Sequence, residues 1–211
     1  MPVLYERQMT EKLFHGDETR WEVFEEIDGK TGHRWYLWVM QSASVVYYQM
    51  APGRGADVPK GHLSKLRKDL VEVVLVCDRY SAYKSLALEC EELIVAFCWA
   101  HVRRDFLKAA RSWPELEGWM VTWVVDIREL YHLNATRLEQ WEAGWSLEDQ
   151  SSAFAECHHA LKAKLREMHE RCETPLQEPA LHLAKQKVLS SLHHHWDGLT
   201  VFVDRPEVAM D

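Results

Sequence analysis

The hydrophobic pattern of this chain changes near residue 113, and the change limits the folds that the sequence can form. Before this point, short segments rich in β-branched and aromatic residues alternate with turns, which is typical of strands. After it, apolar residues recur every three or four positions, as in Phe154, Cys157, Leu161 and Leu165, which indicates amphipathic helices. The sequence therefore predicts a part with a sheet, followed by a helical part.

Three strands are expected at the start of the chain, over residues 13–24, 34–43 and 45–50. Their simplest arrangement is an antiparallel meander. The residues that favour a turn between the first two strands are Asp28, Gly29, Lys30 and Gly32.

Helices and strands alternate in the next segment, and the three strands followed by this alternation predict a mixed α/β sheet with helices on its faces. A last helix is expected over residues 180–202, after the break at Pro175 and Pro179. The expected elements between the meander and residue 113 are a loop over 51–62, a helix over 63–70, a strand over 71–77, a helix over 81–89, a strand over 93–99 and a helix over 102–111.

The composition is that of an ordinary globular protein, with 47% hydrophobic and 27% charged residues. The formal net charge of −8 argues against a broad basic surface, so contact with nucleic acid would rely on local patches. There is no apolar run of about 18 residues and no signal peptide, and the five cysteines form no CxxC pair. We expect a cytoplasmic protein in a reducing compartment, without membrane association.

Asp78 lies at the end of the apolar segment VEVVLVC, residues 71–77. One explanation is that it caps the following helix; another is a functional group at the carboxyl end of a central strand. Asp17 interrupts the aromatic first strand, and an acid buried there alone would be costly. If the first strand lies beside the fourth, the two carboxylates converge, and a divalent cation would offset their repulsion.

Four blocks of the sequence resemble IS66-family insertion-sequence transposases. The segments GDETRW (16–21), VCDRYSAYK (76–84) and CWAHVRRDF (98–106) are similar to three blocks of that family's catalytic domain. The ending HHHWDGLTVFVDRPEVAMD (193–211) is similar to the stretch that leads into the family's final catalytic motif. The resemblance runs in order from about residue 13 to the last residue.

The resemblance implies a ribonuclease-H-like fold with an Asp-Asp-Glu metal site, in which Asp17 and Asp78 match the two aspartates. Such a site uses Mg²⁺ (or Mn²⁺) ions to cleave DNA strands and transfer them. The implied partners are DNA, as transposon ends and target, and a second copy of the chain or a full-length transposase.

The resemblance also divides the chain into a catalytic core over 1–112, a helical insertion over 113–178 and a helix over 179–211 that returns to the core. Asp211 matches the aspartate that opens the final motif, and the family's catalytic glutamate would follow it; Glu207 precedes the motif and is a poor substitute. We therefore expect a truncated transposase with impaired activity. The alternatives are an inactive remnant that acts as a protein-interaction module and an unrelated metal-dependent nuclease with the same fold.

The block CWAHVRRDF places His101, Arg103 and Arg104 at the start of a helix. Its backbone N–H groups and guanidiniums would bind a DNA phosphate, or the segment is a solvated helix face with a packed histidine. Arg79 stands where the family usually has a small residue such as glycine, and it either contacts phosphate or is tolerated at the surface. Tyr80 and Tyr83 either line a DNA groove or pack against the sheet.

Two other groups invite a metal hypothesis. Cys98 and His101 form half of a zinc site, but the chain offers no second pair at a suitable spacing. The histidines of the segments 157–159 and 193–195 are consecutive, and consecutive residues on a helix point in different directions. We expect these two segments to be surface helices.

Overall fold

The structure is a computed structural model that describes residues 2–23, 34–67 and 69–211. The chain divides into two compact units, Met1–Phe97 and Cys98–Asp211. The predicted turn at Asp28, Gly29, Lys30 and Gly32 lies outside the described residues. Within the described part of the chain, no helix is long and apolar enough to cross a membrane.

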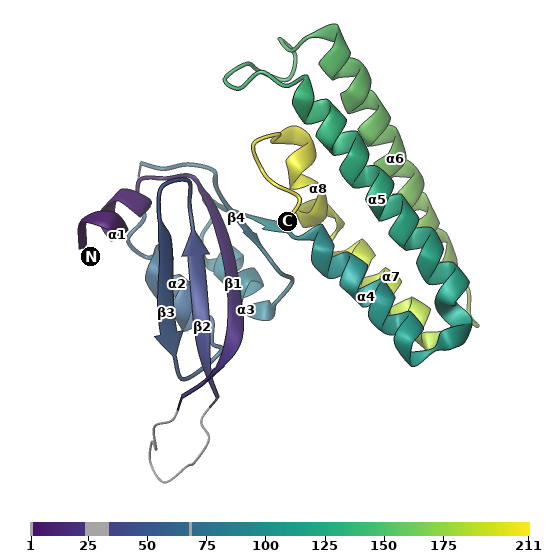
Figure 1. Cartoon of the computed structure of the whole chain (residues 1–211), viewed down its shortest axis with the longest axis horizontal. Coiled ribbons are helices and arrows are strands. Elements are labelled where there is room, and N and C mark those ends of the chain that lie inside the picture. Colours follow the sequence, from purple (N-terminus) through teal and green to yellow (C-terminus); the bar gives the residue numbers. More distant parts are fainter. Residues whose placement is uncertain (1, 24–33, 68) are drawn as a thin grey trace. The chain divides into compact units, whose positions relative to one another are not determined.

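The described residues of the first unit form a five-stranded mixed sheet in the order β3-β2-β1-β4-β5 (Figure 1). The first three strands pair antiparallel, as the predicted meander requires, while β1 pairs parallel with β4 and β4 pairs parallel with β5. Strand β4 begins only at Val73, because Glu72 adopts a left-handed conformation with φ of 59° that ends an extended run. The strands are β1 (Leu13–Glu22), β2 (Arg34–Gln41), β3 (Val46–Ala51), β4 (Val73–Cys77) and β5 (Leu93–Phe97).

Among the described residues of the first unit, three helices accompany this sheet: α1 (Pro2–Gln8), α2 (Asp57–Leu63) and α3 (Ser81–Glu89). The prediction of α3 is confirmed, but the loop predicted over 51–62 contains α2, and the helix predicted over 63–70 is wrong. Pro59 is the third residue of α2. The N–H groups of the first turn of a helix have no partner within it, so a proline there removes no hydrogen bond.

The core of the first unit lies against one face of the sheet. Phe14 of β1, Leu75 of β4 and Tyr83 of α3 are each 0% exposed and belong to one hydrophobic cluster. Burying a side chain of this size stabilises a fold by about 1.5–3 kcal/mol. Gly16 permits the close packing, because a Cβ atom there would lie 3.2 Å from Leu75 and 3.4 Å from Tyr83.

In its described residues the second unit is helical, as the sequence predicts from residue 113 onward. The helix expected over 102–111 begins earlier, at Trp99, so β5 ends at Phe97. The elements are α4 (Trp99–Ser112), the 3₁₀ turn η1 (Pro114–Leu116), α5 (Glu117–Glu139), α6 (Ser152–Leu176), α7 (Leu183–His194) and α8 (Trp196–Asp204).

The single helix predicted over 180–202 is wrong, because α7 and α8 are separated at His195. His195 leaves the helical conformation, with φ of −106° and ψ of 13°. Its ring Nδ1 lies 2.6 Å from the carbonyl oxygen of Ser191. A side chain that bonds to a backbone group in this way competes with the helix ladder.

Aromatic and apolar side chains fill the space among these helices. Phe106 of α4 stacks on Trp123 of α5, with ring centroids 5.0 Å apart. The indole N–H of Trp99, which is 0% exposed, donates to the carbonyl oxygen of Leu199 at 2.7 Å. Helix α5 packs along α6, and α6 packs against α7 (Figure 1).

Candidate active site

Asp17 lies on β1, and Asp78 directly follows the neighbouring parallel strand β4. The last residues paired between β1 and β4 are His15 and Val76, and each acid lies two residues further along its own strand direction. Adjacent strands are about 4.8 Å apart. The backbone thus brings the two acids to the same level of the sheet, where β4 ends.

The two carboxylates have different surroundings. Asp17 is exposed, and its Oδ1 accepts the N–H of Glu18 at 2.8 Å. Asp78 is partly buried, and its Oδ1 accepts the N–H of Tyr80 at 2.9 Å. Helix α3 begins only at Ser81, so this bond stabilises the turn before α3. Asp78 does not bond to the first-turn N–H groups of α3, as a helix cap would.

Glu18 and Arg54, which the sequence analysis did not identify, adjoin Asp78. The Glu18 side chain is 0% exposed. It accepts hydrogen bonds from the Arg54 Nε at 2.6 Å and from the Tyr83 hydroxyl at 2.8 Å. Burial raises the pKa of Glu18, while the bonds to Tyr83 and Arg54 oppose that rise. The same guanidinium lies 3.8 Å from Asp78 Oδ2 and so bridges two acids.

The Arg54 side chain is fixed by Tyr80. Its guanidinium lies over the Tyr80 ring, 3.8 Å from the centroid, and the Tyr80 hydroxyl donates to the Arg54 carbonyl oxygen at 2.6 Å. Tyr83, in contrast, is a core residue that packs against Trp38, as the packing interpretation expected. Burial raises the pKa of its hydroxyl, which therefore stays protonated and donates to Glu18.

The sequence offered a signal for only one of the two missed residues. Glu18 lies within the GDETRW segment and has the same strand parity as Phe14 and Gly16, so its side chain points toward the core. Arg54 lies in a Gly- and Pro-containing loop with no periodicity to indicate its direction.

The expected DNA-binding residues lie on two elements. Arg103 and Arg104 are exposed on α4, and His101 is partly buried with an Nδ1 that has no hydrogen-bond partner among the described residues. Arg79 is partly buried directly after Asp78, in the first unit.

Asp211 binds the start of α4. Its Oδ1 accepts the N–H of Ala100 at 3.0 Å and the hydroxyl of Tyr131, and lies 3.6 Å from the Cys98 Sγ. Burial raises the pKa of the Tyr131 hydroxyl, and its bond to Asp211 raises it further. The first turn of α4 therefore already binds an acid of this chain, at the place where a phosphate was expected.

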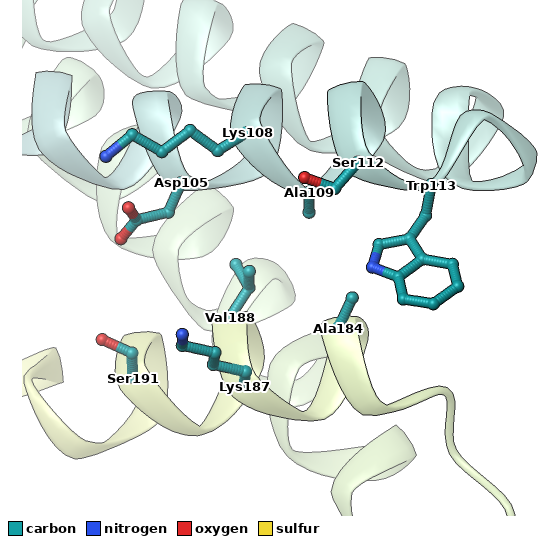
Figure 2. Close-up of a pocket in the computed structure, with 9 residues that line it drawn as sticks. All are labelled: Asp105, Lys108, Ala109, Ser112, Trp113, Ala184, Lys187, Val188 and Ser191. Atoms are coloured by element: carbon teal, nitrogen blue, oxygen red, sulfur yellow. The ribbon is translucent and has the colours of Figure 1, made fainter.

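A cavity of about 370 Å³ lies between α4 and α7 in the second unit (Figure 2). Lys108 and Lys187 supply positive charge, Asp105 opposes it, and Trp113 contributes an apolar wall. Its single carboxylate faces two lysines, so the cavity lacks the paired acids that the sequence predicts for a metal site.

Comparison with known proteins places these observations in a family. The chain is 30% identical over 147 residues to the uncharacterized protein y4jD of Sinorhizobium fredii, which covers 65% of this chain and 26% of that protein. It is 34% identical over 111 residues to y4qI of the same organism, which covers 46% of this chain and 19% of that protein. These matches span about a quarter or less of either relative. The model of the IS66 transposase family matches residues 1–211, and the chain belongs to that family.

Proposed function

We propose that this chain is part of a DNA transposase and that Asp17 and Asp78 together hold a divalent cation, Mg²⁺ or Mn²⁺. The observation that carries the proposal is the parallel pairing of β1 with β4, which brings the acids to one level of the sheet. Family membership supports transposition as the process in which they act.

The donors suit such an ion. Mg²⁺ prefers oxygen ligands, and one or two carboxylates together with water and substrate phosphates are sufficient to bind it. Asp17 is exposed, and the cationic neighbour of Asp78, Arg54, is 3.8 Å away. When bound, the ion would activate a water or a DNA 3′-hydroxyl and stabilise the leaving oxygen of a phosphoryl transfer.

The surrounding side chains would position Asp78. The guanidinium of Arg54 links the Asp78 carboxylate to the buried Glu18. Tyr80 donates its backbone N–H to the Asp78 carboxylate, and its ring stacks on the Arg54 guanidinium. Residues that lock a ligand in this way reduce the reorganisation needed when an ion binds. Asp17 has the freer carboxylate of the two.

We propose further that the sheet is of the ribonuclease-H-like type. Its support is the strand order, in which an antiparallel meander is followed by two parallel strands and the first strand lies beside the fourth. This is the arrangement in which the acids of the first and fourth strands adjoin, as the resemblance implies.

DNA is the proposed substrate, both as transposon ends and as target. Arg103 and Arg104 are exposed at the start of α4, where guanidiniums would pair with phosphates. His101 and Arg79 are the other proposed contacts. Because the net charge is −8, binding would depend on these local cations rather than on the overall field.

A strand-cleavage assay tests the proposal. The wild-type chain should nick a DNA duplex in Mg²⁺ or Mn²⁺, at a slow rate if its activity is impaired as expected from the sequence, and should not nick it in a chelator. Asp78→Asn should reduce the rate by about 100-fold or more, a loss of roughly 3 kcal/mol of transition-state stabilisation. Asp197→Asn, which changes an exposed acid of α8, is the matched control and should leave the rate unchanged.

Equal rates for the wild-type chain and Asp78→Asn would contradict the assignment of Asp78. Absence of cleavage by the wild-type chain would contradict the activity itself. If such an inactive chain were captured by a full-length relative, the interaction-module alternative would be favoured.

A further inference from the structure

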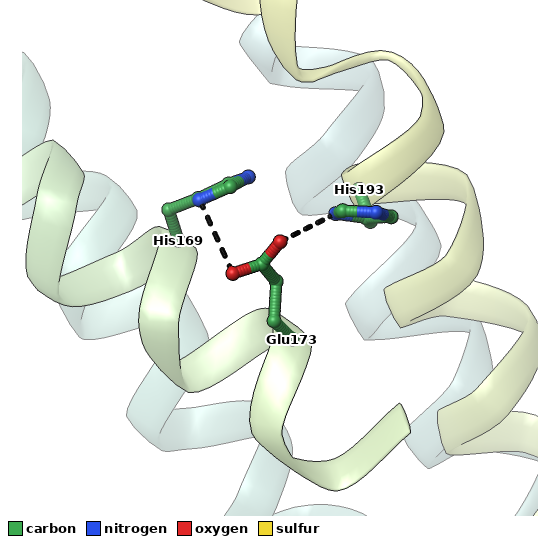
Figure 3. Close-up of side chains that lie close together, drawn as sticks. All are labelled: His169, Glu173 and His193. Atoms are coloured by element: carbon green, nitrogen blue, oxygen red, sulfur yellow. Dashed lines mark ion pairs between the residues drawn. The ribbon is translucent and has the colours of Figure 1, made fainter. Parts of the chain in front are cut away.

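Three metal-ligating side chains meet on the second unit, away from the acids discussed above. His169 and Glu173 are one turn apart on α6, and His193 projects toward them from the last turn of α7 (Figure 3). Their donor atoms all lie within 4.8 Å of one another. Among the described residues, this is the one group of three or more such donors close enough to share an ion.

The distances are those of ligands around an ion rather than of hydrogen bonds. His169 Nδ1 lies 3.7 Å from one Glu173 oxygen, and His193 Nδ1 lies 3.6 Å from the other. Both separations exceed the roughly 2.7–3.2 Å of an N–H···O bond. Two ligands about 2.0–2.1 Å from a tetrahedral zinc ion are about 3.4 Å apart.

The donor types select the metal. Two imidazole nitrogens and one carboxylate form a set that zinc accepts, with the fourth position open to water. Mg²⁺ and Ca²⁺ prefer sites made of oxygen atoms alone. The group has no thiolate, so it lacks the soft ligand that favours Cu(I).

Packing already orients the donors. The His169 ring lies against Trp196 of α8, with centroids 4.6 Å apart, and the His169 and His193 rings stack at 5.6 Å. Beneath them, the buried Cys172 of α6 donates from its Sγ to the Leu189 carbonyl oxygen of α7 at 3.3 Å. The two helices are thus fixed in register before any ion binds.

The remaining histidines of the HHH segment do not belong to this group. His194 is exposed, and the Nδ1 of His195 is used by the Ser191 carbonyl. A cavity of about 620 Å³ lies beside the donors and is lined by Glu173, Thr174, Leu176, Gln177 and His193. It leaves room for a water at the open position.

We propose that His169, Glu173 and His193 bind one zinc ion that joins α6 to α7. The ion neutralises the Glu173 carboxylate, which lies between the two imidazoles. It links two side chains of α6 to His193, at the far end of α7. Its role is to stabilise the helical unit, independently of the acids at residues 17 and 78.

Zinc competition with a chromophoric chelator tests this site. The full chain should bind one equivalent of zinc, while Mg²⁺ should not displace it. His193→Ala and Glu173→Gln should each weaken binding by at least about tenfold, since even outer-shell partners of zinc ligands contribute about 10- to 100-fold. His194→Ala, the neighbouring exposed histidine, should bind as the wild type does.

Thermal unfolding supplies a second readout. Zinc should raise the Tm of the wild-type chain and of His194→Ala, because a ligand of the folded state stabilises it by mass action. At the same zinc concentration it should raise the Tm of His193→Ala by less, and the circular dichroism of this variant should match that of the wild type. Zinc binding that is absent from the wild type, or unchanged in both His193→Ala and Glu173→Gln, would overturn the proposal.

Discussion

Two neighbouring acids on β1 have opposite environments. Asp17 is exposed, whereas the side chain of Glu18 is fully buried, because successive side chains on a strand point to opposite faces. Arg54 compensates the buried charge and lies between Glu18 and Asp78. An acid directly after an apolar strand, such as Asp78, and an acid that interrupts an aromatic strand, such as Asp17, are both visible in a sequence. The pairing of Glu18 with Arg54, 36 residues away, depends on how the intervening chain folds.

Replacing Arg54 tests this arrangement. Arg54→Met should destabilise the fold by about 1–3 kcal/mol, since it leaves the buried Glu18 carboxylate without its cation. In the double variant Glu18→Gln/Arg54→Met the two effects should not add, with a coupling of about 0.5–3 kcal/mol. Urea unfolding measures both. Arg67→Met, which removes an exposed arginine paired with Asp69, is the control and should leave stability unchanged; additive effects at residues 18 and 54 would contradict the account.

His62 should make the fold sensitive to acid. It is 6% exposed and lies 3.0 Å from Gln8 Oε1, and burial lowers its pKa to about 4 from the ordinary 6.5. Above pH 6.5 the imidazole is neutral in both the folded and the unfolded chain, so its titration does not change the free energy of unfolding. As the pH falls from 6.5 to 4 the unfolded chain gains a proton that the folded chain does not, so stability falls by roughly 2–3 kcal/mol.

The measurement is the free energy of unfolding in urea at pH 7 and at pH 4.5. Between pH 7 and pH 4.5 the wild type should lose more stability than His62→Gln, because the glutamine side chain cannot titrate. All other titratable groups are the same in the two proteins. Equal losses in the two proteins would show that His62 does not contribute.

At the scale of elements, the errors of the sequence analysis are the position of α2, the single helix predicted over 180–202 and the ends of several elements. Pro59 and Gly61 are typical of loops, yet both lie within α2, because Val58 and Leu63 are buried and the proline occupies the first turn. The break at His195 depends on a contact between its ring and the backbone, which no periodicity indicates. Segments with strong apolar patterns, such as β4 and α3, were predicted well because burial itself determines them.

An ion cluster joins α5 to α6 and offers a test at this scale. Asp126 is 6% exposed, accepts a hydrogen bond from Lys164 Nζ at 2.7 Å and pairs with Arg171, whose guanidinium lies over the Trp123 ring. Asp126→Ala should destabilise the fold by about 1–3 kcal/mol, because it removes the buried acid of both cations and leaves them only the more exposed Glu129 and Glu167.

Glu129 supplies the matched control, because it pairs with the same Lys164 at 2.8 Å but its side chain is 50% exposed. Glu129→Ala should cost about 0–1 kcal/mol. Chemical denaturation measures the free energy of unfolding of both variants. Similar losses of stability for Asp126→Ala and Glu129→Ala would contradict the argument that the buried acid contributes more.

For the whole molecule, the sequence predicted a mixed sheet followed by helices, and the structure has both. Hydrophobic periodicity could not predict that β1 pairs with β4, because these strands lie about 60 residues apart in the sequence. Periodicity predicts that strands exist, but not which strands are neighbours. The group of His169, Glu173 and His193 was missed for the same reason, because it forms only when α7 packs on α6. Both sites depend on long-range contacts.

The central claim is that Asp17 and Asp78 share a divalent cation, and Mn²⁺ binding followed by electron paramagnetic resonance tests it most directly. The titration uses the His193→Ala background, which removes the proposed zinc site. Asp17→Asn and Asp78→Asn should each weaken Mn²⁺ binding by about tenfold or more, about 1.4 kcal/mol, while Asp197→Asn should bind as the background does. Mn²⁺ affinity that is unchanged by the loss of either acid would contradict the claim.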